Sequence, residues 1–282
     1  MSMTVSVLNR IPNDAEYKKT YPEMRGRGNS GTHELHIFLS ELNPSQERVK
    51  TYYQAVNDWN KQHPEITDKM KACYLALVFR SSDGSENTVK VMQSARYLRS
   101  DDTDQVVKEC HSDADFFVKH SFSVIREKIE ATAHGIDGIP QTDAETQTHK
   151  TKYFEFHIKV GHKDAGDNTA LNEDEIEQLK AISRQFTSNF GTPIPLSYNC
   201  NQDGISGDGL GHQRFLNVRF RDLGMSSIKP KLDEINQAIT AVGLRVIKTI
   251  SEYVWYDSFT QLDHGWIDYT PEEFAKITLG QQ

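Results

Sequence analysis

Hydrophobic and polar residues alternate along two stretches of the chain, and this period of two predicts half-buried strands. In residues 33–40 the odd positions from 35 onward are Leu, Ile and Leu, whereas Glu34 and His36 occupy the other face. Residues 152–160 repeat the pattern. The polar face of this second strand carries three ionisable residues: Glu155, His157 and Lys159. Each of these two strands is therefore predicted to carry a row of titratable groups on the face opposite its apolar side chains.

Between and beyond these strands, apolar residues recur every three or four positions, which predicts helices. The predicted helices cover about residues 44–59, 104–120, 173–186 and 227–242, with Asn43 as N-cap of the first and Ser227 as N-cap of the last. The remaining predicted strands cover residues 74–79, 88–98, 123–131, 194–198, 215–221 and 245–256. Each half of the chain therefore has the order strand, helix, strand, strand, helix, strand.

Short matches at a nearly constant spacing suggest that one half of the chain duplicates the other. Residues 34–37 (ELHI) match residues 155–158 (EFHI), and residues 124–126 (VIR) match residues 246–248 (VIK). The order of strands and helices in each half is that of ferredoxin-like folds. The sequence therefore predicts an α+β fold of two ferredoxin-like repeats, which form a pseudo-dimer with the helices outside and a shared polar sheet face.

The predicted repeats cover residues 32–134 and 151–270, and a linker at residues 135–150 joins them. Residues 1–31 are expected to form a loose arm and residues 271–282 a C-terminal tail. A hydrophobic content of 37% is typical of a globular chain. Because the pseudo-dimer lies within one chain, we expect a monomer or a weak homodimer.

Charge and cysteine content exclude several classes of protein. The net charge of −8 argues against non-specific binding to nucleic acids or anionic membranes, which needs a positive surface. No apolar stretch is long enough to span a membrane, and the first residues lack a signal-peptide pattern. The three cysteines have no C-x-x-C spacing, which favours reduced thiols over disulfides or a cysteine zinc site. We therefore expect a cytoplasmic protein without a membrane partner.

The polar faces of the predicted strands carry arginines and histidines in both halves of the chain. Two interpretations are open. A sheet covered by helices on one side leaves its other face to water, which explains the alternation without any ligand. Arginines and histidines that face carboxylates are also what a phosphate or carboxylate site uses, and this favours a site for a small anionic ligand. The candidate ligand-binding residues are Arg96, Arg126, Lys128, Glu130, Lys159, Asn199, Arg219, Arg221 and Glu252.

Catalysis at this face would depend on two histidines. His157 or His36 would act as general acid or base, oriented by Glu155 or Glu34. The predicted function is the binding of a small phosphorylated or nucleotide-like anion between the repeats, with hydrolysis or transfer by a phosphoester or phosphoanhydride hydrolase or transferase as a further step. The alternative is a non-catalytic interaction scaffold with a solvated polar face. The same four side chains are suitable ligands for a divalent cation if they converge.

Two resemblances bear on the polar face. The Glu155-x-His157-x-Lys159 strand is similar to the E-x-E-x-K strand of the triphosphate-tunnel (CYTH-type) phosphohydrolases, whose barrel encloses a metal-bound polyphosphate. His157 replaces the middle carboxylate of that motif. The second half also resembles a family of uncharacterised proteins, which implies a shared fold and a shared face but no reaction. The segments that carry this second resemblance are YFEFHIK (153–159), LSYN (196–199), EYVWYDS (252–258) and LDHGWI (262–267).

A glycine-rich segment at residues 204–211 precedes His212 and lies between two predicted strands. Its spacing is not that of a phosphate-binding loop before a helix. We expect a flexible loop, with closure over a ligand and a general-acid role for His212 as the alternatives. The aromatic residues near the C-terminus are expected to be core, with base stacking as the alternative: Tyr253, Trp255, Tyr256 and Trp266.

Overall fold

Eight strands and five helices form the described part of the protein. The computed structural model describes residues 31–80, 86–132, 139–147, 152–163, 169–192, 194–200 and 214–259. The strands are β1 (Gly31–Leu42), β2 (Lys71–Arg80), β3 (Glu86–Ser100), β4 (Val124–Thr132), β5 (Tyr153–His162), β6 (Leu196–Asn199), β7 (Arg214–Phe220) and β8 (Leu244–Asp257). The helices are α2 (Gln46–Gln62), α3 (Thr103–Lys119), α4 (Asp143–Thr146), α5 (Glu173–Phe190) and α6 (Met225–Ala241). The predicted arm up to residue 30, the tail, the glycine-rich segment, His212 and Trp266 lie outside the described residues.

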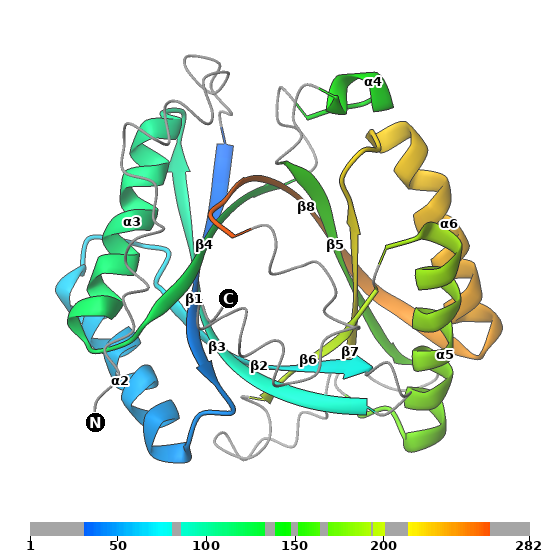
Figure 1. The fold of residues 1–282 in the computed structure, drawn as a ribbon, viewed down its shortest axis with the longest axis horizontal. Helices are drawn as coiled ribbons and strands as arrows, with labels where there is room; N and C mark the ends of the chain where they lie inside the picture. Colours follow the sequence, from blue (N-terminus) through cyan, green and yellow to red (C-terminus); the bar gives the residue numbers. More distant parts are fainter. Residues whose placement is uncertain are drawn as a thin grey trace, which may run out of the picture.

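The eight strands join into one closed antiparallel barrel, in the order β1-β3-β2-β6-β7-β5-β8-β4 (Figure 1). The pairing of β2 with β6 and that of β4 with β8 connect residues 31–132 to residues 153–257 at two seams. Every strand of the barrel therefore has a hydrogen-bonded neighbour on both sides.

The prediction of two ferredoxin-like repeats that form a pseudo-dimer is therefore wrong, and a ferredoxin-like duplication is not supported. Strands and helices follow one another as β-α-β-β-α-β on each side of the short helix α4, but separate repeats would leave β2, β4, β6 and β8 as sheet edges. An edge strand exposes a row of N–H and C=O groups without partners. Edge-to-edge pairing satisfies these groups and closes the sheet.

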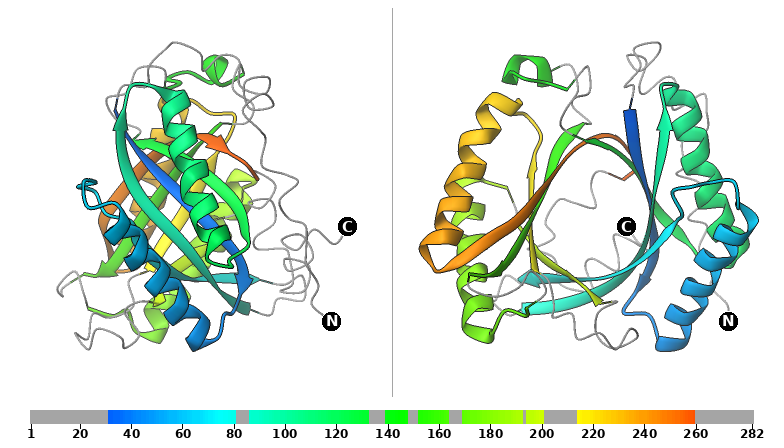
Figure 2. Two further views of the ribbon diagram at one scale, coloured as in Figure 1. Left: turned by 90° about the vertical axis from the view of Figure 1, so that its left-hand side faces the viewer. Right: turned by 180° about the vertical axis from the view of Figure 1, so that it is seen from behind.

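The long helices cover the outside of the barrel. Figures 1 and 2 show α2 and α3 against one side of it and α5 and α6 against the other. Tyr52 of α2 and Ile235 of α6 are fully buried, and they belong to the same apolar core as Leu35 and Ile37 of β1. Burial of such a side chain contributes about 1.5–3 kcal/mol. In the described part of the chain, no helix is long and apolar enough to cross a membrane.

Two helices begin at residues other than those predicted. The N-cap of α2 is Ser45, whose hydroxyl accepts a hydrogen bond from the first turn, whereas Asn43 takes the left-handed conformation with φ 47°. Helix α6 begins after Gly224 rather than after Ser227. A Cβ at position 224 would lie 2.4 Å from the carbonyl carbon of Thr142, so close packing of the backbone selects glycine there.

Strand register decides which side chains meet inside the barrel. Glu34 on β1 lies opposite Tyr97 on β3 and opposite Glu130 on β4. Successive side chains of a strand point to opposite faces of the sheet. Tyr97 therefore faces the interior with Glu34, and its neighbour Arg96 points outward to the helices.

Candidate functional site

The interior of the barrel contains a cavity of about 310 Å³. One part of its wall consists of Cys73 and the apolar residues Phe38, Leu39, Leu42, Leu75, Leu77, Val91, Ile125, Phe215 and Ile250. The polar part consists of Glu34, His36, Gln93, Tyr97, Lys128, Glu130, Glu155, His157, Ser197, Asn199, Asn217, Arg219 and Glu252. The cavity can thus hold an apolar body and offer hydrogen-bonding partners to a polar group.

Glu34, His36 and Glu130 form the first group of titratable side chains, here called the His36 cluster. His36 Nε2 lies 2.7 Å from Glu130 Oε2 and 3.9 Å from Glu34 Oε1. On its other side, His36 Nδ1 lies 2.5 Å from the amide nitrogen of Gln93. Burial lowers the pKa of His36, but the carboxylates of Glu130 and Glu34 outweigh burial, so that the pKa is raised. The two carboxylates therefore favour the charged form of the imidazole.

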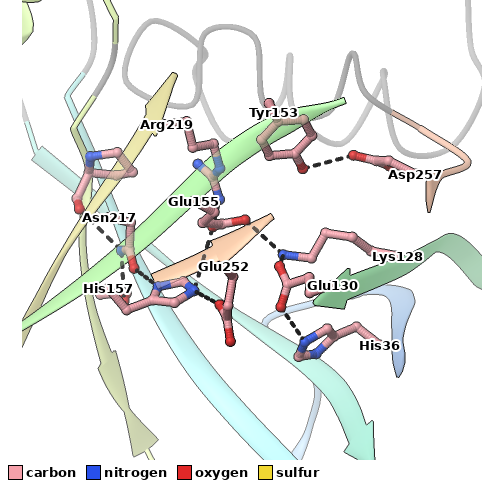
Figure 3. Close-up of polar contacts among 12 residues, drawn as sticks. His36, Lys128, Glu130, Tyr153, Glu155, His157, Asn217, Arg219, Glu252 and Asp257 are labelled. Carbon is pink, nitrogen blue, oxygen red and sulfur yellow. Dashed lines mark hydrogen bonds and ion pairs between the residues drawn. The ribbon is translucent and has the colours of Figure 1, made fainter. Parts of the chain in front are cut away.

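Lys128 links this cluster to Glu155 of β5, which lies two strands away around the barrel (Figure 3). Its ammonium group contacts Glu130 Oε1 and lies 2.9 Å from Glu155 Oε2. Burial lowers the pKa of Lys128, but the two carboxylates outweigh burial and raise the pKa above its usual value. Lys128 is therefore a buried cation that two carboxylates already neutralise.

Glu155, His157 and Glu252 form the second group, the His157 cluster. Glu155 on β5 lies opposite Arg219 on β7 and opposite Glu252 on β8. The Arg219 guanidinium donates to Glu155 Oε1 at 2.6 Å. Burial raises the pKa of Glu155, but Arg219 and Lys128 outweigh burial and lower the pKa to about 2. Glu155 therefore stays ionised and acts as the counter-ion of both cations.

The surroundings of Asn217 fix the tautomer of His157. The Asn217 amide donates to the Pro195 carbonyl at 3.2 Å and to the Ser197 hydroxyl at 2.9 Å, so its oxygen must face the imidazole. That oxygen lies 2.6 Å from His157 Nδ1, which therefore carries a hydrogen. Proton exchange at His157 is thus confined to Nε2, which lies 3.2 Å from Glu252 Oε2.

His157 and Glu252 form an ion pair in a strongly perturbed environment (Figure 3). Burial lowers the pKa of His157, but the hydrogen bond to Glu252 and the nearby carboxylates raise the pKa to about 9. Burial and the negative charge of Glu130 raise the pKa of Glu252 to about 7, although His157 opposes them. A carboxyl group of this kind can gain or lose a proton at neutral pH, which is a property of general acid–base groups.

Four of the predicted ligand-binding residues do not line the cavity. Arg96 points into the helix layer, where Nε lies 2.5 Å from Asp113 and a terminal nitrogen lies 2.9 Å from Glu109. Arg126 is buried against Asp257 and Tyr153 rather than in the cavity wall. The other two residues outside the wall are Lys159 and Arg221. The remaining candidates line the cavity: Glu34, His36, Lys128, Glu130, Glu155, His157, Asn199, Arg219 and Glu252.

The arrangement of charges does not support the predicted phosphate-binding hydrolase. Lys128 and Arg219 are the lysine and arginine of the cavity wall, and both form ion pairs with Glu155. A phosphate would have to displace these carboxylate partners and would meet the negative charge of the other glutamates. The predicted anion site is therefore corrected to a cavity whose cations are already paired.

The residues that the sequence analysis missed are mainly those of β3 and the apolar wall. Val91, Gln93 and Tyr97 alternate with Met92, Ser94 and Arg96, and each face of β3 mixes polar and apolar residues. Alternation of polarity therefore does not reveal which face is inside. Leu75 and Leu77 of β2 belong to a nearly uniform apolar run, which is also what a buried strand shows.

Comparisons with known proteins identify no family for this chain. No family model matches it, and no curated protein matches it; the two resemblances of the sequence therefore stay predictions. A Fusobacterium nucleatum protein described as a candidate monooxygenase matches at 11% identity and a TM-score of 0.30, over 85% of this chain and 98% of the other. A dye-decolorizing protein from V. cholerae matches at 12% identity and a TM-score of 0.23, over 80% and 94%. A candidate chlorite dismutase matches at 9% identity and a TM-score of 0.24, over 79% and 94%.

Proposed function

We propose that the barrel cavity binds a small, largely apolar organic molecule whose polar group contacts the His157 cluster and exchanges a proton with it. The observation that carries this proposal is the cavity itself, because about 310 Å³ of space has one apolar wall and one wall of titratable groups. Volumes of about 300 Å³ and more, with mostly apolar walls and a few placed polar groups, are typical of sites for small molecules.

The chemistry that the cavity supports is proton transfer. Asn217 holds Nδ1 of His157 protonated, so that Nε2 and Glu252 Oε2 are the exchanging atoms, 3.2 Å apart. With the pKa of Glu252 near 7, the pair can accept a proton from a bound molecule or return one to it at neutral pH. Lys128 and Arg219 keep Glu155 ionised beside this pair and so fix the local charge.

Thermal unfolding in the presence of probe compounds tests the proposal. The panel contains phenol, benzylamine, benzoate and hexanol, beside inorganic phosphate, tripolyphosphate and AMP. A compound at about 100 times its Kd adds about 2.7 kcal/mol to the free energy of unfolding, which raises Tm by roughly 5 °C in a chain of this size. We expect shifts with members of the first group and none with the phosphates.

A variant that fills the cavity separates binding there from binding elsewhere. Leu75 of β2 is half-buried and lines the cavity, so Leu75→Trp should abolish the shift without removal of any polar group. Val78 of the same strand is also half-buried but is absent from the wall, so Val78→Trp should keep the shift. Equal shifts in both variants, or shifts with the phosphates alone, would refute the proposal.

A further inference from the structure

The His36 and His157 clusters have the same composition and a similar geometry. Each consists of a histidine and a glutamate two positions apart on one strand, together with a glutamate from the neighbouring strand. In the His157 cluster, His157 Nε2 lies 3.8 Å from Glu155 and 3.2 Å from Glu252. In the His36 cluster the corresponding distances are 3.9 Å and 2.7 Å. Two carboxylates and an imidazole therefore face each other twice inside the barrel.

The residue opposite the first glutamate distinguishes the two clusters. Glu155 lies opposite Arg219, which donates to it at 2.6 Å. Glu34 lies opposite Tyr97, a neutral phenol whose hydroxyl hydrogen-bonds to the carboxylate. In the described part of the chain, no lysine or arginine forms an ion pair with Glu34. Arg219 thus pairs with the first glutamate of the His157 cluster, whereas Glu34 faces a phenol and an imidazole, and Lys128 contacts only Glu130 of the His36 cluster.

The ligand atoms of the His36 cluster lie close enough to share one ion. One oxygen of each glutamate and Nε2 of His36 all lie within 4.8 Å of one another, and they line the cavity. Bonds of about 2.1 Å in octahedral geometry place neighbouring ligand atoms about 3 Å apart and opposite ones about 4.2 Å apart. The separations of 2.7 Å and 3.9 Å from His36 Nε2 fall near these values, and the two carboxylate oxygens lie within 4.8 Å of each other.

We propose that Glu34, His36 and Glu130 bind a divalent first-row transition-metal ion in the wall of the barrel cavity. One imidazole and two carboxylates suit Mn²⁺, Fe²⁺, Co²⁺ or Zn²⁺ better than Mg²⁺ or Ca²⁺, which prefer oxygen ligands alone. Three protein ligands leave coordination positions that a molecule in the cavity can occupy.

Gln93 acts as a positioning residue for this site. A metal-ligating histidine needs a hydrogen on its second nitrogen and an acceptor for that hydrogen. The Gln93 amide lies 2.5 Å from His36 Nδ1, and a half-turn of the amide brings its oxygen to that nitrogen. The site therefore has both its ligands and the support that holds the imidazole in place.

The test is metal binding by the full-length protein, freed of metal with a chelator and measured without any organic ligand. Calorimetry with Mn²⁺ and Zn²⁺ and visible absorption with Co²⁺ should show one ion bound at this site. His36→Gln and Glu34→Gln should each weaken binding by about 100-fold, and replacement of Gln93 by Leu should weaken it by about 10-fold. Because the organic ligand is absent from this measurement, a lack of metal binding would not contradict the proposed binding of an organic molecule. Likewise, a lack of binding by the organic probes would not contradict the metal site.

Tyr97→Arg is the sharpest variant, because it keeps all three ligands. The variant puts an arginine opposite Glu34, as Arg219 lies opposite Glu155. The new guanidinium should pair with the Glu34 carboxylate and so abolish metal binding. His157→Gln is the matched control, since it removes the equivalent imidazole from the other cluster. Because the positive charge of His157 acts on Glu130, its removal should not weaken metal binding. Circular dichroism and Tm establish that each variant folds.

Three results would overturn the proposal. If the wild-type protein binds none of Mn²⁺, Zn²⁺ and Co²⁺, the proposed metal site does not exist. Unchanged affinity in His36→Gln, Glu34→Gln and Tyr97→Arg would show that the ion binds elsewhere in the chain. Equal losses in His157→Gln and His36→Gln would show that the two clusters are not distinguished by Tyr97 and Arg219.

Discussion

Replacement of Arg219 by Met tests the electrostatic account of the cavity. Arg219 and Lys128 lower the pKa of Glu155 from its usual 4.5 to about 2. At ~1.4 kcal/mol for each pKa unit, this difference corresponds to about 3 kcal/mol of stability. Arg219 is the larger of the two causes, so we expect Arg219→Met to lower the free energy of unfolding by about 2 kcal/mol at pH 7.

The sign of the pH dependence follows from the lowered pKa. Both the folded and the unfolded wild-type protein carry an ionised Glu155 at pH 7, and the stabilisation is fully present above pH 4.5. It is lost as pH falls from 4.5 toward 2, where the folded carboxylate also takes up a proton. In Arg219→Met the folded pKa is higher, so the deficit relative to wild type should be largest at pH 7 and should shrink at lower pH.

Urea unfolding at pH 7 and at about pH 3.5, followed by circular dichroism, measures both the loss and its pH dependence. Lys159→Met is a suitable control, because Lys159 lies on the same strand as Glu155 but does not line the cavity and faces Lys248 across the strand pair. Lys159 is half-buried and lies beside another cation, so its replacement should lower stability by less than about 1 kcal/mol. A loss in Arg219→Met that is equally large at both pH values would refute the electrostatic account, and so would a loss no larger than that of the control.

Two further predictions concern other ion pairs. Glu252→Gln should lower the pKa of His157 from about 9 toward its usual 6.5, because it removes the leading cause of the increase. NMR titration of the imidazole measures this pKa, and an unchanged midpoint would exclude Glu252 as the cause. Arg96→Met should cost about 3–5 kcal/mol in urea unfolding because it leaves Asp113 buried without its cation. Glu109→Ala, which removes the 40% exposed partner, should cost less than about 1 kcal/mol, and equal losses would contradict this ranking.

Local sequence patterns were sufficient to locate the chemistry of the cavity. The alternation of residues 33–40 and 152–160 brought Glu34, His36, Glu155 and His157 to attention, and the structure places all four in the cavity wall. This works because side-chain direction along a strand depends only on the backbone of that strand. The catalytic roles predicted for them stay predictions.

The same patterns failed where two strands must be aligned. The sequence analysis assigned Arg96 and Arg219 to the same predicted ligand site, but the register places Tyr97 against Glu34 and Arg219 against Glu155. A shift of one residue moves a side chain to the other face of the sheet. Arg96 consequently belongs to the helix layer, and the difference between the two clusters was hidden.

The sequence by itself determined where strands and helices lie, because hydrophobic periodicity acts within a single element. Only the tertiary structure decided that β2 pairs with β6 and β4 with β8, and thus that the sheet closes into a barrel. Backbone hydrogen bonds make these pairings, and they are nearly independent of side-chain identity. In an open sheet the polar strand faces would have been exposed to water; closure of the barrel makes them the wall of a cavity. Closure also brings Lys128 of β4 to 2.9 Å from Glu155 of β5.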